Sequence, residues 1–82
     1  MKPSLKFLQK VRDGRVRHEC TYWSAPLGGT YRWRGGEKTA KKYAAAGYVT
    51  IPSAGPSLGR PAVVTLTKLG ESTRLELHAG RG

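Results

Sequence analysis

Residues 37–51, with the sequence EKTAKKYAAAGYVTI, decide how this chain folds. Good helix formers fill residues 37–46, the acidic Glu37 suits the first turn of a helix, and Gly47 follows as a stop signal. Residues 48–51 are aromatic or β-branched, which favours a strand. The sequence therefore predicts a helix over 37–46 that leads directly into a strand.

This predicted helix has one face for packing and one for cations. Residues three or four positions apart lie on the same side of a helix. The packing face consists of small and aromatic residues, namely Ala40, Tyr43, Ala44 and Gly47. The other side carries Lys38, Lys41, Lys42 and Ala45. One side is therefore expected to pack while the other presents positive charge.

A long hairpin is predicted after the helix. Residues 48–51 and 62–67 are both β-rich, and the segment between them, 52–61, contains three prolines and two glycines. Prolines and glycines in such numbers are typical of a loop. We therefore expect the two β-rich segments to pair and the segment between them to form a protruding tip.

The chain is predicted to end in a short helix and a tail. Thr67 is a suitable cap for a helix over 68–77. Leu69, Thr73 and Leu77 recur along it at intervals of four residues, which is a helical spacing. Residues 78–82 are expected to be a frayed tail.

The first part of the chain predicts another helix. Pro3 suits the first turn of a helix over 3–13, Ser4 is a suitable cap, and Gly14 ends the helix. Apolar residues recur along this segment with helical spacing, namely Leu5, Phe7, Leu8 and Val11.

Residues 15–33 predict a first hairpin. Aromatic and β-branched residues fill this segment, and a loop of small residues with one proline interrupts it at 24–29. The aromatic residues are Tyr22, Trp23, Tyr31 and Trp33. Because the loop is longer than a two-residue turn, the register of the two strands does not follow from the sequence.

The net charge of +10 points to a polyanionic partner. Residues 1–42 hold eleven basic and three acidic residues, whereas residues 43–82 hold four and two. The first half of the chain is therefore the expected electrostatic footprint. A length of 82 residues suits one domain, 1–82, with a thin core.

Three short stretches in the second half of the chain carry a family resemblance. They are YAAAGYVTI at 43–51, Gly59-Arg60, and VVTLTKLG at 63–70. They resemble the end of the recognition helix, the wing, and the Leu-Thr-x-x-Gly start of the next helix in winged helix-turn-helix DNA-binding proteins. Relatives of this kind include multiple-antibiotic-resistance-type repressors and many small actinobacterial and phage proteins. The resemblance implies an α+β, winged-helix-like domain ordered as helix, aromatic β-hairpin, basic helix, β-wing and short helix.

Residues 15–35 depart from that family pattern. Winged helix-turn-helix domains have a separate positioning helix before the recognition helix, and here strands and a loop are predicted instead. Two alternatives stay open: the aromatic hairpin replaces the positioning helix, or a poor helix lies over 21–27.

The resemblance implies double-stranded DNA as the partner and names the residues that reach it. Lysine suits phosphate, threonine suits a base edge or a thymine methyl, and a wing arginine suits the minor groove or a phosphate. Arg32 and Arg34 lie on alternate positions of a predicted strand and so share a face. The expected DNA-binding residues are Arg32, Arg34, Lys38, Thr39, Lys41, Lys42 and Arg60. The expected role is that of a small transcriptional regulator or a phage architectural or recombination factor, acting as a monomer or a homodimer.

Each of these residues also has an ordinary interpretation. A row of lysines on a helix is often only its solvated face, and Arg60 is equally consistent with an exposed loop cation. The aromatic residues of the first hairpin suit a core, single-stranded nucleic acid or RNA, or docking on an acidic host protein. These alternatives stay open beside duplex DNA.

Catalysis, metal binding and cofactors are not expected. The five carboxylates are scattered, so no acidic pair is implied. His18 and Cys20 alternate on one predicted strand, but a nucleophile with its base lacks an orienting third group there, and zinc would need more ligands. The lone Cys20 also permits no intrachain disulfide. With no run as long as a membrane span and no signal-peptide pattern, we expect a cytoplasmic, nucleoid-associated protein.

Overall fold

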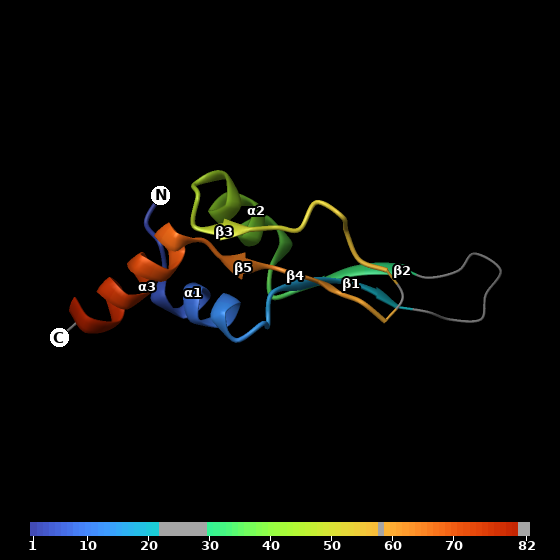
Figure 1. Cartoon of the computed structure of the whole chain (residues 1–82), viewed down its shortest axis with the longest axis horizontal. Helices are drawn as coiled ribbons and strands as arrows, with labels where there is room; N and C mark the ends of the chain where they lie inside the picture. Colours follow the sequence, from blue (N-terminus) through green and yellow to red (C-terminus); the bar gives the residue numbers. More distant parts are fainter. Residues whose placement is uncertain (22–29, 58, 81–82) are drawn as a thin grey trace.

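Three helices and two small antiparallel sheets make up a small α+β domain (Figure 1). The computed structural model describes residues 1–21, 30–57 and 59–80. In chain order the elements are α1 (Leu5–Arg12), β1 (Arg17–Thr21), β2 (Thr30–Arg34), α2 (Glu37–Ala45), β3 (Val49–Thr50), β4 (Ala62–Val63), β5 (Thr65–Leu66) and α3 (Lys68–Gly80). The predicted α+β class is therefore found, but the winged-helix order is not confirmed, because the paired strands β1 and β2 precede α2.

Helix α1 is shorter than the predicted range 3–13, because it begins at Leu5, directly after the predicted cap Ser4, and ends at Arg12. The Ser4 side chain accepts a hydrogen bond from the Phe7 amide at 3.3 Å, which satisfies one of the free amides of the first turn. Phe7, Leu8 and Val11 are buried, so the apolar spacing seen in the sequence does mark the packing face. The chain turns after Asp13 and enters the first hairpin at Arg17.

The first hairpin, β1 with β2, is antiparallel. Its register runs from Arg17 opposite Arg34 to Thr21 opposite Thr30. The connecting residues 22–29, which include Tyr22 and Trp23, lie outside the described residues. The alternative helix over 21–27 is wrong at Thr21, because this residue belongs to β1. Residues 22–27 lie outside the described residues as well.

The second hairpin divides its return segment between two sheets. Val49 pairs with Leu66 in β3 and β5, as the sequence predicted. The preceding residues Ala62 and Val63 instead pair with β1, giving the strand order β2-β1-β4. The single strand expected over 62–67 is therefore wrong. It breaks at Val64, which belongs to neither strand and has its side chain buried in the core, because the residues before it pair with β1 and those after it pair with β3.

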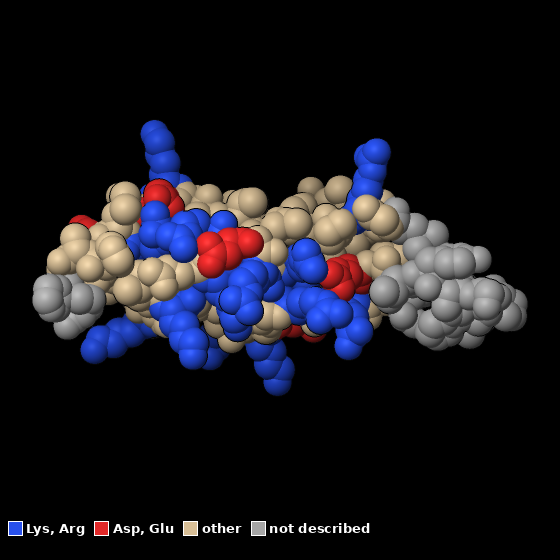
Figure 2. All heavy atoms as spheres, turned by 90° about the horizontal axis from the view of Figure 1, so that it is seen from below, with Lys and Arg blue, Asp and Glu red and all other residues tan. Residues whose placement is uncertain are grey.

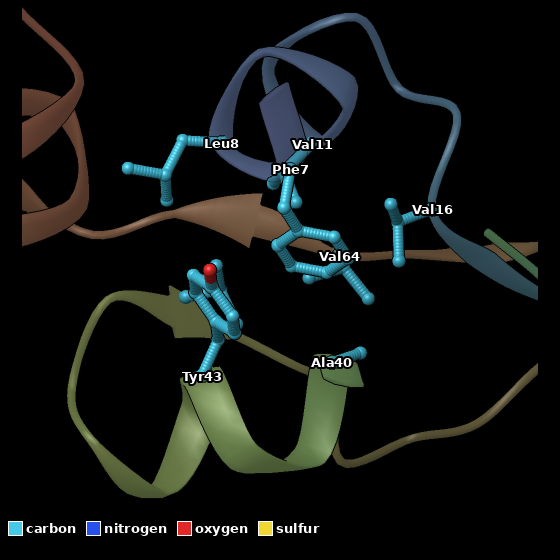
Figure 3. Packing of buried hydrophobic residues seen from close by; sticks show 8 residues of the cluster. Phe7, Leu8, Val11, Val16, Ala40, Tyr43 and Val64 are labelled. Carbon is cyan, nitrogen blue, oxygen red and sulfur yellow. The ribbon is translucent and has the colours of Figure 1, made fainter. Parts of the chain in front are cut away.

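The core lies between α1 and α2 (Figure 3). Tyr43 of α2 stacks obliquely on Phe7, with 4.4 Å between ring centroids. Its hydroxyl accepts a hydrogen bond from the Ser4 amide at 2.7 Å, so the phenol is satisfied while its ring is buried. Ala40 packs one turn before Tyr43. The predicted packing face of α2 is confirmed at both positions.

Helix α3 begins as predicted and ends later. The Thr67 hydroxyl accepts a hydrogen bond from the Gly70 amide at 3.0 Å, so Thr67 is the expected cap. The helix continues to Gly80, so the end predicted at residue 77 and the frayed tail at 78–80 are wrong. Residues 78 and 79 are His and Ala, neither of which breaks a helix, and this accounts for the extension; residues 81–82 lie outside the described residues.

The packing face of α3 includes Leu77 but not Leu69 of the residues that recur at intervals of four. Leu69 is half exposed, whereas Gly70 and Arg74 are buried and Leu77 packs against the core. A side chain at Gly70 would overlap the backbone carbonyl of Tyr48. Because α3 lies so close to that carbonyl, the side of the helix that contains Gly70 and Arg74 faces the core. Leu69 therefore faces solvent.

Replacement of Gly70 by alanine should therefore destabilise the fold. The added methyl group would collide with backbone that cannot move aside easily, and overpacking of this kind costs about 1 to 3 kcal/mol. For a domain of this size, that loss lowers Tm by roughly 4 to 8 °C per kcal/mol. The matched control is Gly80→Ala in the same helix, where nothing lies within 4 Å. Equal thermal midpoints for the two variants would contradict this packing.

Candidate nucleic-acid interface

A groove lined by cations lies where α1 ends and the first hairpin begins. Its larger part is a hollow of about 430 Å³ lined by Lys10, Asp13, Gly14, Arg15, Arg17, Arg34 and Gly35. A smaller hollow of about 270 Å³ shares some of these residues and adds Lys6 and Gln9. We call the two together the cationic groove. Figure 2 shows lysine and arginine gathered over the middle of this face, which is the face on the α1 side of the molecule.

Alternation along the chain aims two arginines toward the groove. Val16 is completely buried in the core, between Arg15 and Arg17. Successive side chains of an extended chain point to opposite sides. Burial of Val16 therefore turns both arginines outward. The Arg15 amide also donates a hydrogen bond to the Lys10 carbonyl at 3.0 Å, which holds the linker against the end of α1.

Glycine at position 35 brings the end of β2 against this linker. Gly35 has a φ of +91°, which residues with side chains rarely adopt. A β-carbon there would lie 2.7 Å from the Arg15 carbonyl oxygen and 2.9 Å from Val16. The close crossing is therefore possible only with glycine, and it places Arg34 in the same groove as Arg15 and Arg17.

One carboxylate holds two of the arginines. The Nε atom of Arg34 donates to Glu19 Oε1 at 2.9 Å, and Arg17 Nε lies 2.8 Å from Glu19 Oε2. The pKa of Glu19 is lowered, chiefly by the hydrogen bond from Arg34 and further by the charge of Arg17. The strand register puts all three side chains on one face, because Arg17 and Glu19 alternate on β1 and Arg34 is opposite Arg17. We call these residues the arginine–glutamate triad.

The groove keeps a strong excess of positive charge. Of its lining residues in the described part of the chain, Asp13 alone is acidic, and it pairs with Arg12 at 3.1 Å. Lys6, Lys10, Arg15, Arg17 and Arg34 supply the cations. Such a concave cationic surface concentrates anions and suits phosphate groups.

The predicted DNA-binding residues occupy three places. Arg32 and Arg34 share a face of β2, with Arg34 in the cationic groove and Arg32 outside its lining. Arg60 is exposed at the tip of the second hairpin, where its backbone amide donates to the Ser57 carbonyl at 2.8 Å.

The predicted residues of α2 are exposed and do not line the groove. These residues are Lys38, Thr39, Lys41 and Lys42. Lys38 and Lys42 lie opposite the buried Ala40 face, so they point away from the core. Lys41 donates to Glu37 at 2.8 Å, one helical turn earlier, and so is partly neutralised. The structure therefore separates these lysines from Arg34.

Four groove cations were missed by the sequence-based selection, namely Lys6, Lys10, Arg15 and Arg17. A signal for them was present: Lys6 and Lys10 are one helical turn apart, and Arg15 and Arg17 flank an apolar residue. The pairing of β1 with β2 was needed to bring them together with Arg34.

The opposite face of the first hairpin is aromatic. The His18 ring stacks on Trp33 with 4.8 Å between centroids and an angle of 9°, and it also contacts Tyr31 at 5.7 Å. Trp33 packs in part against the core, whereas Tyr31 is 63% exposed. The described aromatic residues of this hairpin therefore divide between packing and solvent.

Two further features of the described residues bear on the site. No group of three or more His, Cys, Asp or Glu residues in residues 1–21, 30–57 and 59–80 is arranged to hold a metal ion. In the same ranges no helix is long and apolar enough to cross a membrane.

The fold and the site define a small α+β domain with a cationic groove between its first helix and its first hairpin. Comparison of the chain with models of protein families, with curated proteins and with solved structures gave no match. The functional argument therefore depends on the residues themselves.

Acid should weaken the fold through its ion pairs. Three carboxyl groups have a lowered pKa because a neighbouring cation donates to each: Glu19 from Arg34, Glu37 from Lys41 and Glu71 from Arg74. A lowered pKa in the folded state stabilises the protein above the ordinary carboxyl value, and this contribution is lost as pH falls through the lowered pKa. Stability should therefore decline below about pH 4.5, the ordinary value.

The Glu71 ion pair gives the sharpest test of this pH dependence. Arg74 donates to both Glu71 oxygens, at 3.2 and 2.7 Å, and its side chain is largely buried. The Glu71→Gln variant should have a lower urea midpoint at neutral pH and lose less stability between pH 6 and pH 3 than the original chain. Glu76→Gln, in the same helix, is the control. If Glu71→Gln lost as much stability between pH 6 and pH 3 as the original chain, the contribution of the Glu71–Arg74 ion pair to acid sensitivity would be refuted.

Proposed function

We propose that this protein binds double-stranded DNA, as a small winged-helix-like transcriptional regulator or a phage architectural or recombination factor. The observation that carries the proposal is the cationic groove, where five cations from α1, the linker and the first hairpin meet around a hollow with one lining carboxylate among the described residues. Backbone phosphates are the polyanion that best matches an extended row of such cations.

The second half of the domain supports a winged-helix-like interpretation. Helix α2 is followed by the antiparallel pair β3 and β5 and then by α3, the order that the family resemblance implies for recognition helix, wing and next helix. Thr67 and Gly70 of the Leu-Thr-x-x-Gly stretch form the start of α3, Thr67 as its cap and Gly70 as its close contact with Tyr48. The first hairpin then takes the place of the positioning helix.

The two cationic regions suggest different tasks. The groove contains mainly arginine and lysine, whose charges suit phosphate contact regardless of sequence. Lys38, Thr39 and Lys42 project from the exposed side of α2, where a helix entering the major groove would carry its contacts. In this proposal the cationic groove supplies most of the affinity.

A salt series tests the proposal. Each phosphate contact contributes about 0.9 to the slope of log affinity against log salt. Replacement of Lys6, Lys10 and Arg15 by alanine should therefore lower the slope for duplex DNA by about 2 to 3 and weaken binding at least tenfold. None of these three has an ion pair among the described residues, so their removal should leave the fold intact.

The matched control removes the same charge elsewhere. A Lys38→Ala, Lys42→Ala and Arg60→Ala variant should lose less affinity than the groove variant. A larger loss in this control would move the main contact surface to α2 and the second hairpin. Failure of the original chain to bind duplex DNA at low salt would overturn the proposed function. Stronger binding to single-stranded DNA, RNA or polyglutamate would assign the groove to another polyanion.

A further inference from the structure

The geometry points to a phosphodiester seat formed by Arg17 and Arg34, with Glu19 as the positioning residue that orients the Arg34 guanidinium by a hydrogen bond and holds Arg17 beside it by charge. The inference rests on the proposed function and deepens it, because it names the atoms that meet the DNA backbone. It assigns to Glu19 a contribution to anion binding, although the residue is itself an anion.

The first support is the way in which the arginines meet Glu19. Arg34 Nε donates a hydrogen bond to Glu19 Oε1 at 2.9 Å, whereas Arg17 Nε lies 2.8 Å from Glu19 Oε2 in an ion pair and has no hydrogen-bond partner among the described residues. A guanidinium is planar and rigid, so the hydrogen bond at Arg34 Nε also fixes the direction of the two terminal amino groups of Arg34. These amino groups can donate to phosphate in a bidentate arrangement while Nε stays on Glu19, and the Arg17 guanidinium is held beside them by its charge.

Exposure separates the carboxylate from the cations. The Glu19 side chain is 18% exposed, whereas those of Arg17 and Arg34 are 40% and 52% exposed. An approaching phosphate therefore meets the two guanidinium groups rather than the carboxylate. The cross-strand pairing of Arg17 with Arg34 sets them side by side on one face of the hairpin.

The remaining groove charges favour an anion at this seat. Lys10 and Arg15 line the same hollow as the two arginines, so the local charge stays positive after Glu19 has neutralised one arginine. Glu19 reduces the attraction for DNA by its charge and increases it by ordering the Arg34 side chain in advance and by keeping Arg17 beside it. Preorganisation of this kind lowers the entropy lost on binding.

The Glu19→Gln variant separates these two effects because they have opposite signs. Glutamine keeps the length of the side chain and removes its charge. If Glu19 only repels phosphate, the variant binds duplex DNA more tightly. If it orients the arginines, the variant binds about tenfold more weakly at fixed salt, the scale of one charge-assisted hydrogen bond, even though the net charge has risen by one. Unchanged or tighter binding overturns the inference.

Glu76→Gln is the matched control. It makes the same change of charge on α3, at an exposed carboxylate outside the groove, and should bind equally or slightly more tightly. Urea midpoints at neutral pH establish that both variants are folded at the temperature of the binding assay.

Lysine substitutions test the arginine geometry independently of Glu19. The double variant Arg17→Lys and Arg34→Lys keeps the charge but removes the rigid fork, so its affinity should fall while the salt slope stays near that of the original chain. Unchanged affinity overturns the seat even if Glu19→Gln fails to fold. If the original chain shows no salt-dependent duplex binding, the proposed function itself fails; if it binds and only the variants behave otherwise, the inference alone fails.

Discussion

The arrangement of this domain depends on the hydrogen bond from the Val64 amide to the Val16 carbonyl, 3.0 Å long, between two completely buried residues. Val64 lies between β4, which pairs with β1, and β5, which pairs with β3, so this one residue joins the two sheets. Its side chain lies between α1 and α2 in Figure 3. The same bond fixes Val16 in the core, and that burial turns the neighbouring arginines into the groove.

The thin core and the charged surface are consequences of the same alternation. Leu8, Val16 and Val64 are the largest completely buried side chains in the described part of the chain, and each contributes about 1.5 to 3 kcal/mol by leaving water. Because so few residues supply the core, cations occupy positions directly beside them in the chain, as Arg15 and Arg17 do beside Val16. The domain therefore cannot bury its core without presenting a row of cations on the same segment.

The sequence predicted local structure well and the site poorly, for a physical reason. The cap of α1 and the starts of α2 and α3 followed from side-chain caps, helix formers and the acidic first turn, and both hairpins followed from β-rich segments around turn residues. The division of the return strand at Val64 depends on contacts with β1, more than forty positions away in the chain, which no local pattern encodes. The groove depends on the same contacts and on the crossing at Gly35. The sequence therefore predicted Arg34 as a DNA-binding residue but not the cations that lie beside it in the groove.

The placement of the carboxylates shows how the chain tolerates clustered cations. Glu19 lies between Arg17 and Arg34, Asp13 pairs with Arg12, and Glu71 pairs with Arg74 within reach of the charge of Arg12. Glu37 pairs with Lys41, so four of the five acidic residues lie in ion pairs with neighbouring cations. The exposed pairs among them contribute little stability individually, and they reduce self-repulsion in the free protein. A polyanion in the groove would neutralise the cations that remain, so the electrostatic cost of folding this chain and its proposed affinity for a phosphate backbone have the same origin.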